Sequence, residues 1–69
     1  MEFNEYPSPL IYDAIRQVLK RHPYGILNGQ LVLELVGMGH DVFSQKDIEI
    51  CMNMLGAKPL LGMDAGWKI

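Results

Sequence analysis

Paired apolar positions recur about every four residues between residues 10 and 19, and polar side chains occupy the positions between the pairs. This spacing places the apolar side chains on one face of an α-helix. Ser8 can cap the free amides at the start of that helix, and Pro9 suits its first position because the N–H it lacks needs no partner there. Pro23 disfavours a helical conformation at His22. The pattern predicts an amphipathic helix from Pro9 to about His22.

The next apolar segment, Gln30–Val36, is nearly continuous and is interrupted only by Glu34. A segment this short fits a helix or a strand by periodicity alone. Its leucine, glutamine and glutamate residues favour a helix, whereas its two valines favour a strand. We interpret it as a helix with Asn28 as its candidate cap, followed by a turn at Gly37–Gly39.

A third helix is predicted by a capping box at Ser44–Asp47, in which an aspartate takes the place of the usual glutamate or glutamine. Gly56 provides a left-handed stop about three turns later. The apolar side chains of this helix that share one face are Ile48, Cys51, Met52 and Leu55.

The C-terminal residues predict a short β-hairpin. Asp64–Gly66 has the composition of a turn, and Trp67 and Ile69 alternate with Lys68 beyond it. Two strands alone are marginally stable, so we expect Trp67 to pack the hairpin onto the helices and Tyr24–Ile26 to add a third short strand. The predicted fold is α+β and mainly α, with three helices and a C-terminal hairpin. It forms one domain over residues 8–69, preceded by a tail at 1–7.

Composition narrows the class of protein. The chain has 69 residues, of which 49% are hydrophobic and 20% charged, and its formal net charge is −2. With Cys51 as its single cysteine it cannot form an intramolecular disulfide, which favours a reducing cytoplasm. It shows no signal-peptide pattern and no apolar stretch of membrane-spanning length. The acidic balance argues against a general affinity for phosphate backbones.

The order of these elements, with a short segment near Ile26, a glycine turn before the capped helix, and a hairpin containing Gly66–Ile69, resembles the winged helix-turn-helix superfamily. The resemblance extends from about Ser8 to Ile69 and lies in the order and spacing of elements, because the superfamily has no invariant signature. It implies that the third helix enters a DNA major groove and that the hairpin, the wing, touches the backbone.

The resemblance implies a set of nucleic-acid-binding residues. Gln45 and Asn53 could pair with adenine edges, and Lys46 could meet guanine or a phosphate. Lys58 and Lys68 could meet phosphates from the wing side. Two features depart from a typical DNA-binding member: Glu49 lies in the middle of the reading face, and neither the third helix nor the hairpin contains an arginine.

A second interpretation of the same scaffold is a protein–protein adaptor or subunit. Ile50, Met52 and Met54 are more apolar than an exposed helix face needs, and we expect at least two of the three to lie in the core. If Ile50 and Met54 were exposed, they would form a partner-binding patch, which could also join two copies in a homodimer. The partner is therefore DNA or another protein.

The remaining side chains give no support for catalysis. His22, His40 and Cys51 lack the spacing of metal ligands, so we expect neither a metal nor a cofactor. No pair of acidic residues has the pattern of a general acid and base, and we predict that the protein is not an enzyme. The cluster Arg16, Lys20, Arg21 and His22 fits a phosphate or acidic partner, but it also fits cations that complement the dipole at a helix C-terminus.

Overall fold

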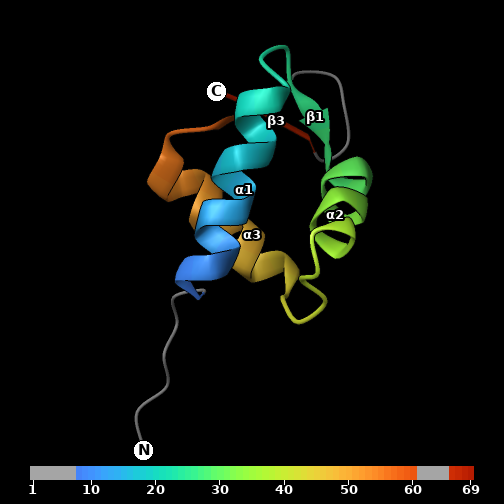
Figure 1. The fold of residues 1–69 in the computed structure, drawn as a ribbon. Coiled ribbons are helices and arrows are strands. Elements are labelled where there is room, and N and C mark those ends of the chain that lie inside the picture. The colour runs from blue at the N-terminus through green and yellow to red at the C-terminus, as the bar shows by residue number, and fades with distance from the viewer. Residues whose placement is uncertain (1–7, 61–65) are drawn as a thin grey trace, which may run out of the picture.

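The order of elements along the chain follows the predicted sequence of helix, short strand, two helices and hairpin. The computed structural model describes residues 8–60 and 66–69, and within them it contains three helices and a three-stranded antiparallel sheet (Figure 1). The predicted class, α+β and mainly α, is confirmed. The expected tail at 1–7 and most of the expected turn at 64–66 lie outside the described residues. The elements are α1 (Pro9–Arg21), β1 (Ile26–Leu27), α2 (Asn28–Gly37), α3 (Gln45–Leu55), β2 (Lys58–Pro59) and β3 (Gly66–Lys68).

Helix α1 begins and ends where its sequence signals predict. Oγ of Ser8 accepts a hydrogen bond from the backbone N–H of Leu10 at 3.0 Å, and Pro9 is the first helical residue. The last helical residue is Arg21, and His22 is the C-cap because Pro23 follows it. Ser8 therefore satisfies an amide that the helix itself leaves unpaired.

Helix α2 confirms the choice of helix over strand, but its predicted cap is wrong. The N-cap is Leu27, which makes no side-chain capping bond, and Asn28 is already the first helical residue. The helix starts directly after strand β1, so Asn28 is one position too late to cap it. Its amide instead bonds to the side chain of Gln45 at the start of α3.

Helix α3 has the reciprocal capping box that its sequence predicts. Oγ of Ser44 accepts from the backbone N–H of Asp47 at 3.2 Å, and the backbone N–H of Ser44 donates to Oδ2 of Asp47 at 3.0 Å. The last helical residue is Leu55, and the C-cap Gly56 has a φ of 74°, the left-handed conformation that glycine adopts without a steric penalty. Both ends of α3 are thus fixed by local interactions.

The third strand forms, with a shifted boundary. Strand β1 is Ile26–Leu27 rather than Tyr24–Ile26, because Tyr24 lies in a turn with 89% of its surface exposed and Gly25 has a φ of 110°. The sheet order is β1–β3–β2, so the last strand lies between the other two. Its register pairs Trp67 with Ile26 on one side and with Pro59 on the other. This order is consistent with a winged-helix-like layout.

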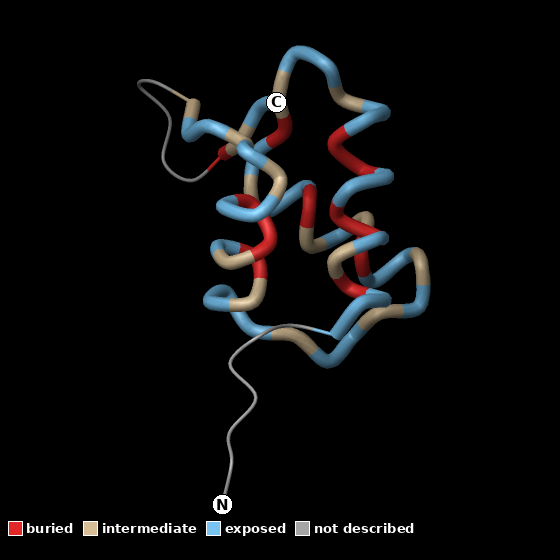
Figure 2. Tube along the Cα trace, turned by 90° about the vertical axis from the view of Figure 1, so that its left-hand side faces the viewer, coloured by how far each residue is buried: buried red, intermediate tan, exposed pale blue. Residues whose placement is uncertain are grey.

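The core lies between the three helices and the inner face of the sheet, and the buried segments of the helices face this common interior (Figure 2). Trp67 is half-buried and packs against the core, which confirms its predicted role of holding the hairpin on the helices. The buried hydrophobic residues are Ile11, Ala14, Ile15, Val18, Leu19, Ile26, Leu31, Leu35, Ile48, Cys51 and Met52.

Candidate functional site

The outer face of α3 carries the four polar side chains that the helical pattern places away from the core. Gln45, Lys46, Glu49 and Asn53 are all exposed. Gln45 is engaged with another side chain, because Nδ2 of Asn28 donates to its Oε1 at 3.1 Å and its Nε2 donates to Oδ1 of Asn28 at 3.2 Å. Both polar atoms of the Gln45 amide thus have partners inside the protein.

The two hairpin lysines are brought together by the sheet. Lys58 and Lys68 are direct cross-strand partners in the register of β2 and β3, and both are exposed. Directly opposed residues project from the same face of a sheet. The neighbouring Trp67 packs on the core side, so the two lysines share the outer face. Among the described residues, no hydrogen bond or ion pair joins either ammonium group to another side chain.

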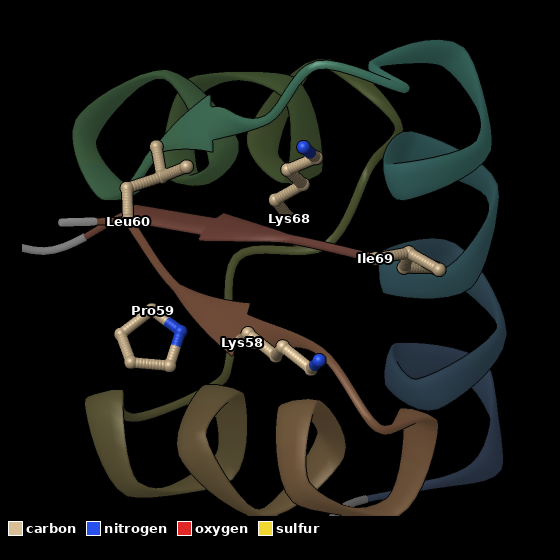
Figure 3. Close-up of a pocket in the computed structure, with 5 residues that line it drawn as sticks. All are labelled: Lys58, Pro59, Leu60, Lys68 and Ile69. Carbon is tan, nitrogen blue, oxygen red and sulfur yellow. The ribbon is translucent and has the colours of Figure 1, made fainter.

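A hollow of about 400 Å³ lies beside these lysines. In Figure 3 the side chains of Lys58 and Lys68 run in different directions, so their ammonium groups point apart. Two like charges in opposed sheet positions repel each other, so this splayed arrangement lowers their mutual repulsion. The lining residues are Lys58, Pro59, Leu60, Lys68 and Ile69.

The apolar flank of α3 is only partly in the core. Met52 is 2% exposed and belongs to the core, whereas Ile50 is half-buried and Met54 is 56% exposed. The expectation that at least two of these three lie in the core is therefore wrong. The hydrophobic face of α3 is centred on Ile48 and Cys51, so Met54 faces away from the core.

A second apolar surface, on α2, was not predicted from the sequence. Leu33 is 73% exposed and Val36 is 51% exposed, and the other exposed positions of this helix are Gly29, Gln30 and Gly37, none of which is charged. The signal was present in the sequence, because a nearly continuous apolar segment has more apolar side chains than one buried face of a helix can use. Only Leu31 and Leu35 of α2 are buried.

The basic residues at the end of α1 are partly neutralised. Arg21 donates to Oε1 of Glu34 at 2.9 Å, and Nε2 of His22 lies 2.6 Å from Oε2 of the same carboxylate. Burial alone would raise the pKa of Glu34, but hydrogen bonds and positive charge from His22 and Arg21 outweigh it, so this pKa is lowered. These contacts join the end of α1 to α2. They favour a structural role for Arg21 and His22.

Two further kinds of site concern the reactivity of the single cysteine and the grouping of side chains that could bind a metal. The thiol of Cys51 is buried, and burial together with the negative charge of Asp47 raises its pKa to about 11. Across residues 8–60 and 66–69, no three side chains of the types His, Cys, Asp and Glu converge as metal ligands would. None of the helices in this part of the chain has the length and apolar character needed to cross a membrane.

Comparison of the chain with models of protein families, with curated proteins and with solved structures found no match.

Proposed function

We propose that this chain is a small winged-helix protein that binds DNA through α3 and the β2–β3 hairpin, as an accessory or regulatory factor. The observation that carries the proposal is the cross-strand pair of Lys58 and Lys68 on the outer face of the sheet. Like charges in opposed positions repel each other, and a bound anion would relieve the repulsion that the splayed arrangement leaves. Lysine is a common phosphate ligand that acts as a point charge.

The splayed ammonium groups favour a polyanion over a single small anion. The side chains of Lys58 and Lys68 run in different directions (Figure 3), so each ammonium group can contact a different phosphate of a nucleic-acid strand. The exposed Lys46 on α3 supplies a further positive charge. Such a limited set of cations in a chain of net charge −2 favours weak binding that depends strongly on salt.

The proposal is tested by titrating a fluorescent duplex of about 20 base pairs with the protein at several low salt concentrations. We expect K58Q and K68Q each to weaken binding about three- to tenfold and to reduce the slope of log K against log salt by about one. The matched control is K20Q, which removes an exposed lysine from α1. Absence of binding at low salt, or equal losses in all three variants, would contradict the proposal.

A second candidate function is that of a protein–protein adaptor. The scaffold leaves apolar side chains exposed, and such side chains can contact a partner protein. Met54 on α3 and the uncharged face of α2 around Leu33 favour it. Self-association is the form of this contact that is tested directly, by sedimentation equilibrium at high protein concentration. A homodimer that uses α2 would be weakened by L33D and left intact by M54D, and one that uses α3 would show the reverse. A strictly monomeric mass would exclude the homodimer.

We further propose that the protein works in the cytoplasm. The single cysteine, Cys51, is buried as a reduced thiol in the core. A buried free thiol is compatible with a reducing compartment. It forms no disulfide, the bond that an oxidising compartment would favour. Fractionation of cells that produce the full chain tests this directly.

A further inference from the structure

We infer that this chain holds duplex DNA by its phosphate backbone and does not read base sequence, and that Asn28 contributes by keeping Gln45 engaged within the protein. The inference rests on the proposed DNA-binding function. It concerns the class of partner, which is any duplex rather than a particular operator sequence.

The first argument is the amide pair between α2 and α3. Gln45 is the first residue of α3, the end from which a recognition helix contacts bases. A glutamine reads adenine with its amide donor and acceptor together. In this protein the same two atoms bond to the donor and acceptor of Asn28, at 3.1 and 3.2 Å. A bidentate contact with adenine would use this same edge of the amide, so it would require breaking both bonds.

The second argument concerns the other polar positions of α3. Glu49 is exposed one turn after Gln45, and its carboxylate repels phosphates on either side of a groove. Asn53 is exposed, but it lies eight residues after Gln45, about 12 Å along the helix axis. It is close to the end of α3 at Leu55, away from the end that would enter the groove.

The third argument is the placement of positive charge. The cationic pair Lys58 and Lys68 lies on the sheet, and α3 itself contributes only Lys46. Contacts of lysine with phosphates position a protein on DNA but carry no direct sequence information. Two or three such contacts predict a slope of log K against log salt of about −2 to −3.

The experiment compares two fluorescent duplexes of equal length, one made only of A·T pairs and one only of G·C pairs. Wherever the protein binds along them, α3 then meets adenine in every base pair of the first duplex and in none of the second. We expect the wild-type protein to bind both within about threefold of each other, with the same salt slope. A preference of tenfold or more for either duplex would overturn the inference but leave the proposed function standing. Absence of binding to both would remove the proposed function and the inference with it.

The contribution of Asn28 is tested with N28A, which frees the amide of Gln45. We expect the ratio of the affinity for the A·T duplex to the affinity for the G·C duplex to be at least threefold higher in N28A than in the wild type. The slope of log K against log salt should not change. The matched control is the double variant N28A/Q45A, in which this gain should disappear. An unchanged preference in a folded N28A would overturn the part assigned to Asn28. If N28A fails to fold, the comparison of the two duplexes with the wild-type protein still decides the main inference.

Discussion

Nε2 of His22 lies 2.6 Å from Oε2 of Glu34, and this contact ties the end of α1 to the middle of α2. An ionised carboxylate only accepts hydrogen bonds, so Nε2 of His22 must carry the proton in this contact. Arg21 holds the other carboxylate oxygen at 2.9 Å. One glutamate of α2 therefore binds both Arg21, the last residue of α1, and His22, its C-cap.

The lowered pKa of Glu34 makes its contribution to stability dependent on pH. A carboxyl group with a lowered pKa in the folded state stabilises the protein above its unfolded pKa, and this stabilisation is lost as the pH falls through the folded pKa. We expect E34Q to lower the free energy of unfolding by about 0.5–1 kcal/mol at pH 7, because Arg21 is half exposed and the ion pair is partly screened.

The pH dependence is measured by thermal unfolding of the wild type and E34Q between pH 3 and 8. The difference in stability should be full at neutral pH and shrink at acidic pH as the wild-type carboxyl group is protonated. D13N is the control, because the contact of Asp13 with Arg16 spans 3.9 Å between exposed side chains. A difference between wild type and E34Q that stays constant down to pH 3 would show that the charge of Glu34 is not the cause.

The capping box of α3 should be visible in stability. S44A removes the side-chain acceptor for the backbone N–H of Asp47, and we expect a loss of about 1 kcal/mol in the free energy of unfolding measured with urea. S44D keeps an acceptor at the N-cap and should retain most of the stability. Equal losses in S44A and S44D would indicate that the hydroxyl has a role other than capping.

Two glycines should respond in opposite ways to alanine. Gly25 has a φ of 110°, and a Cβ there would lie 2.9 Å from Cδ2 of Leu60, so G25A should lower stability by about 1–3 kcal/mol. A Cβ at Gly29 meets nothing within 4 Å, and this position is helical, so G29A should raise stability by about 0.4–1 kcal/mol. Thermal unfolding of G25A and G29A measures both changes in stability. If G25A were more stable than the wild type, the positive φ of Gly25 would be contradicted.

The thiol of Cys51 should be unreactive in the folded protein. It is fully buried and its pKa is raised to about 11, so the reactive thiolate is scarce near pH 8. We expect a disulfide reagent such as Ellman's reagent to label the native protein no faster than the protein unfolds, and to label it rapidly in denaturant. Rapid stoichiometric labelling without denaturant would place Cys51 at the surface.

The sequence determined most of the fold through local signals. Ser8 and Pro9 set the start of α1, the capping box at Ser44–Asp47 set the start of α3, and Gly56 set its end. Each of these signals acts through atoms a few residues apart, so no knowledge of the rest of the chain is needed to interpret it. The periodicity of α1 likewise predicted its buried face, except for Leu10, which lies in the first turn and is 70% exposed. For the hairpin, the same reasoning predicted that Trp67 packs on the helices.

Only the tertiary structure decided which residues meet across the chain. Asn28 was expected to be a cap, but it pairs with Gln45, 17 positions later. The sheet register places Lys58 opposite Lys68, and the packing of α2 leaves Leu33 uncovered. These relationships depend on how elements dock, which is set by the sum of many weak contacts rather than by any local pattern. The sequence supplied the side chains of the candidate site, and the docking of the elements decided which of them act together.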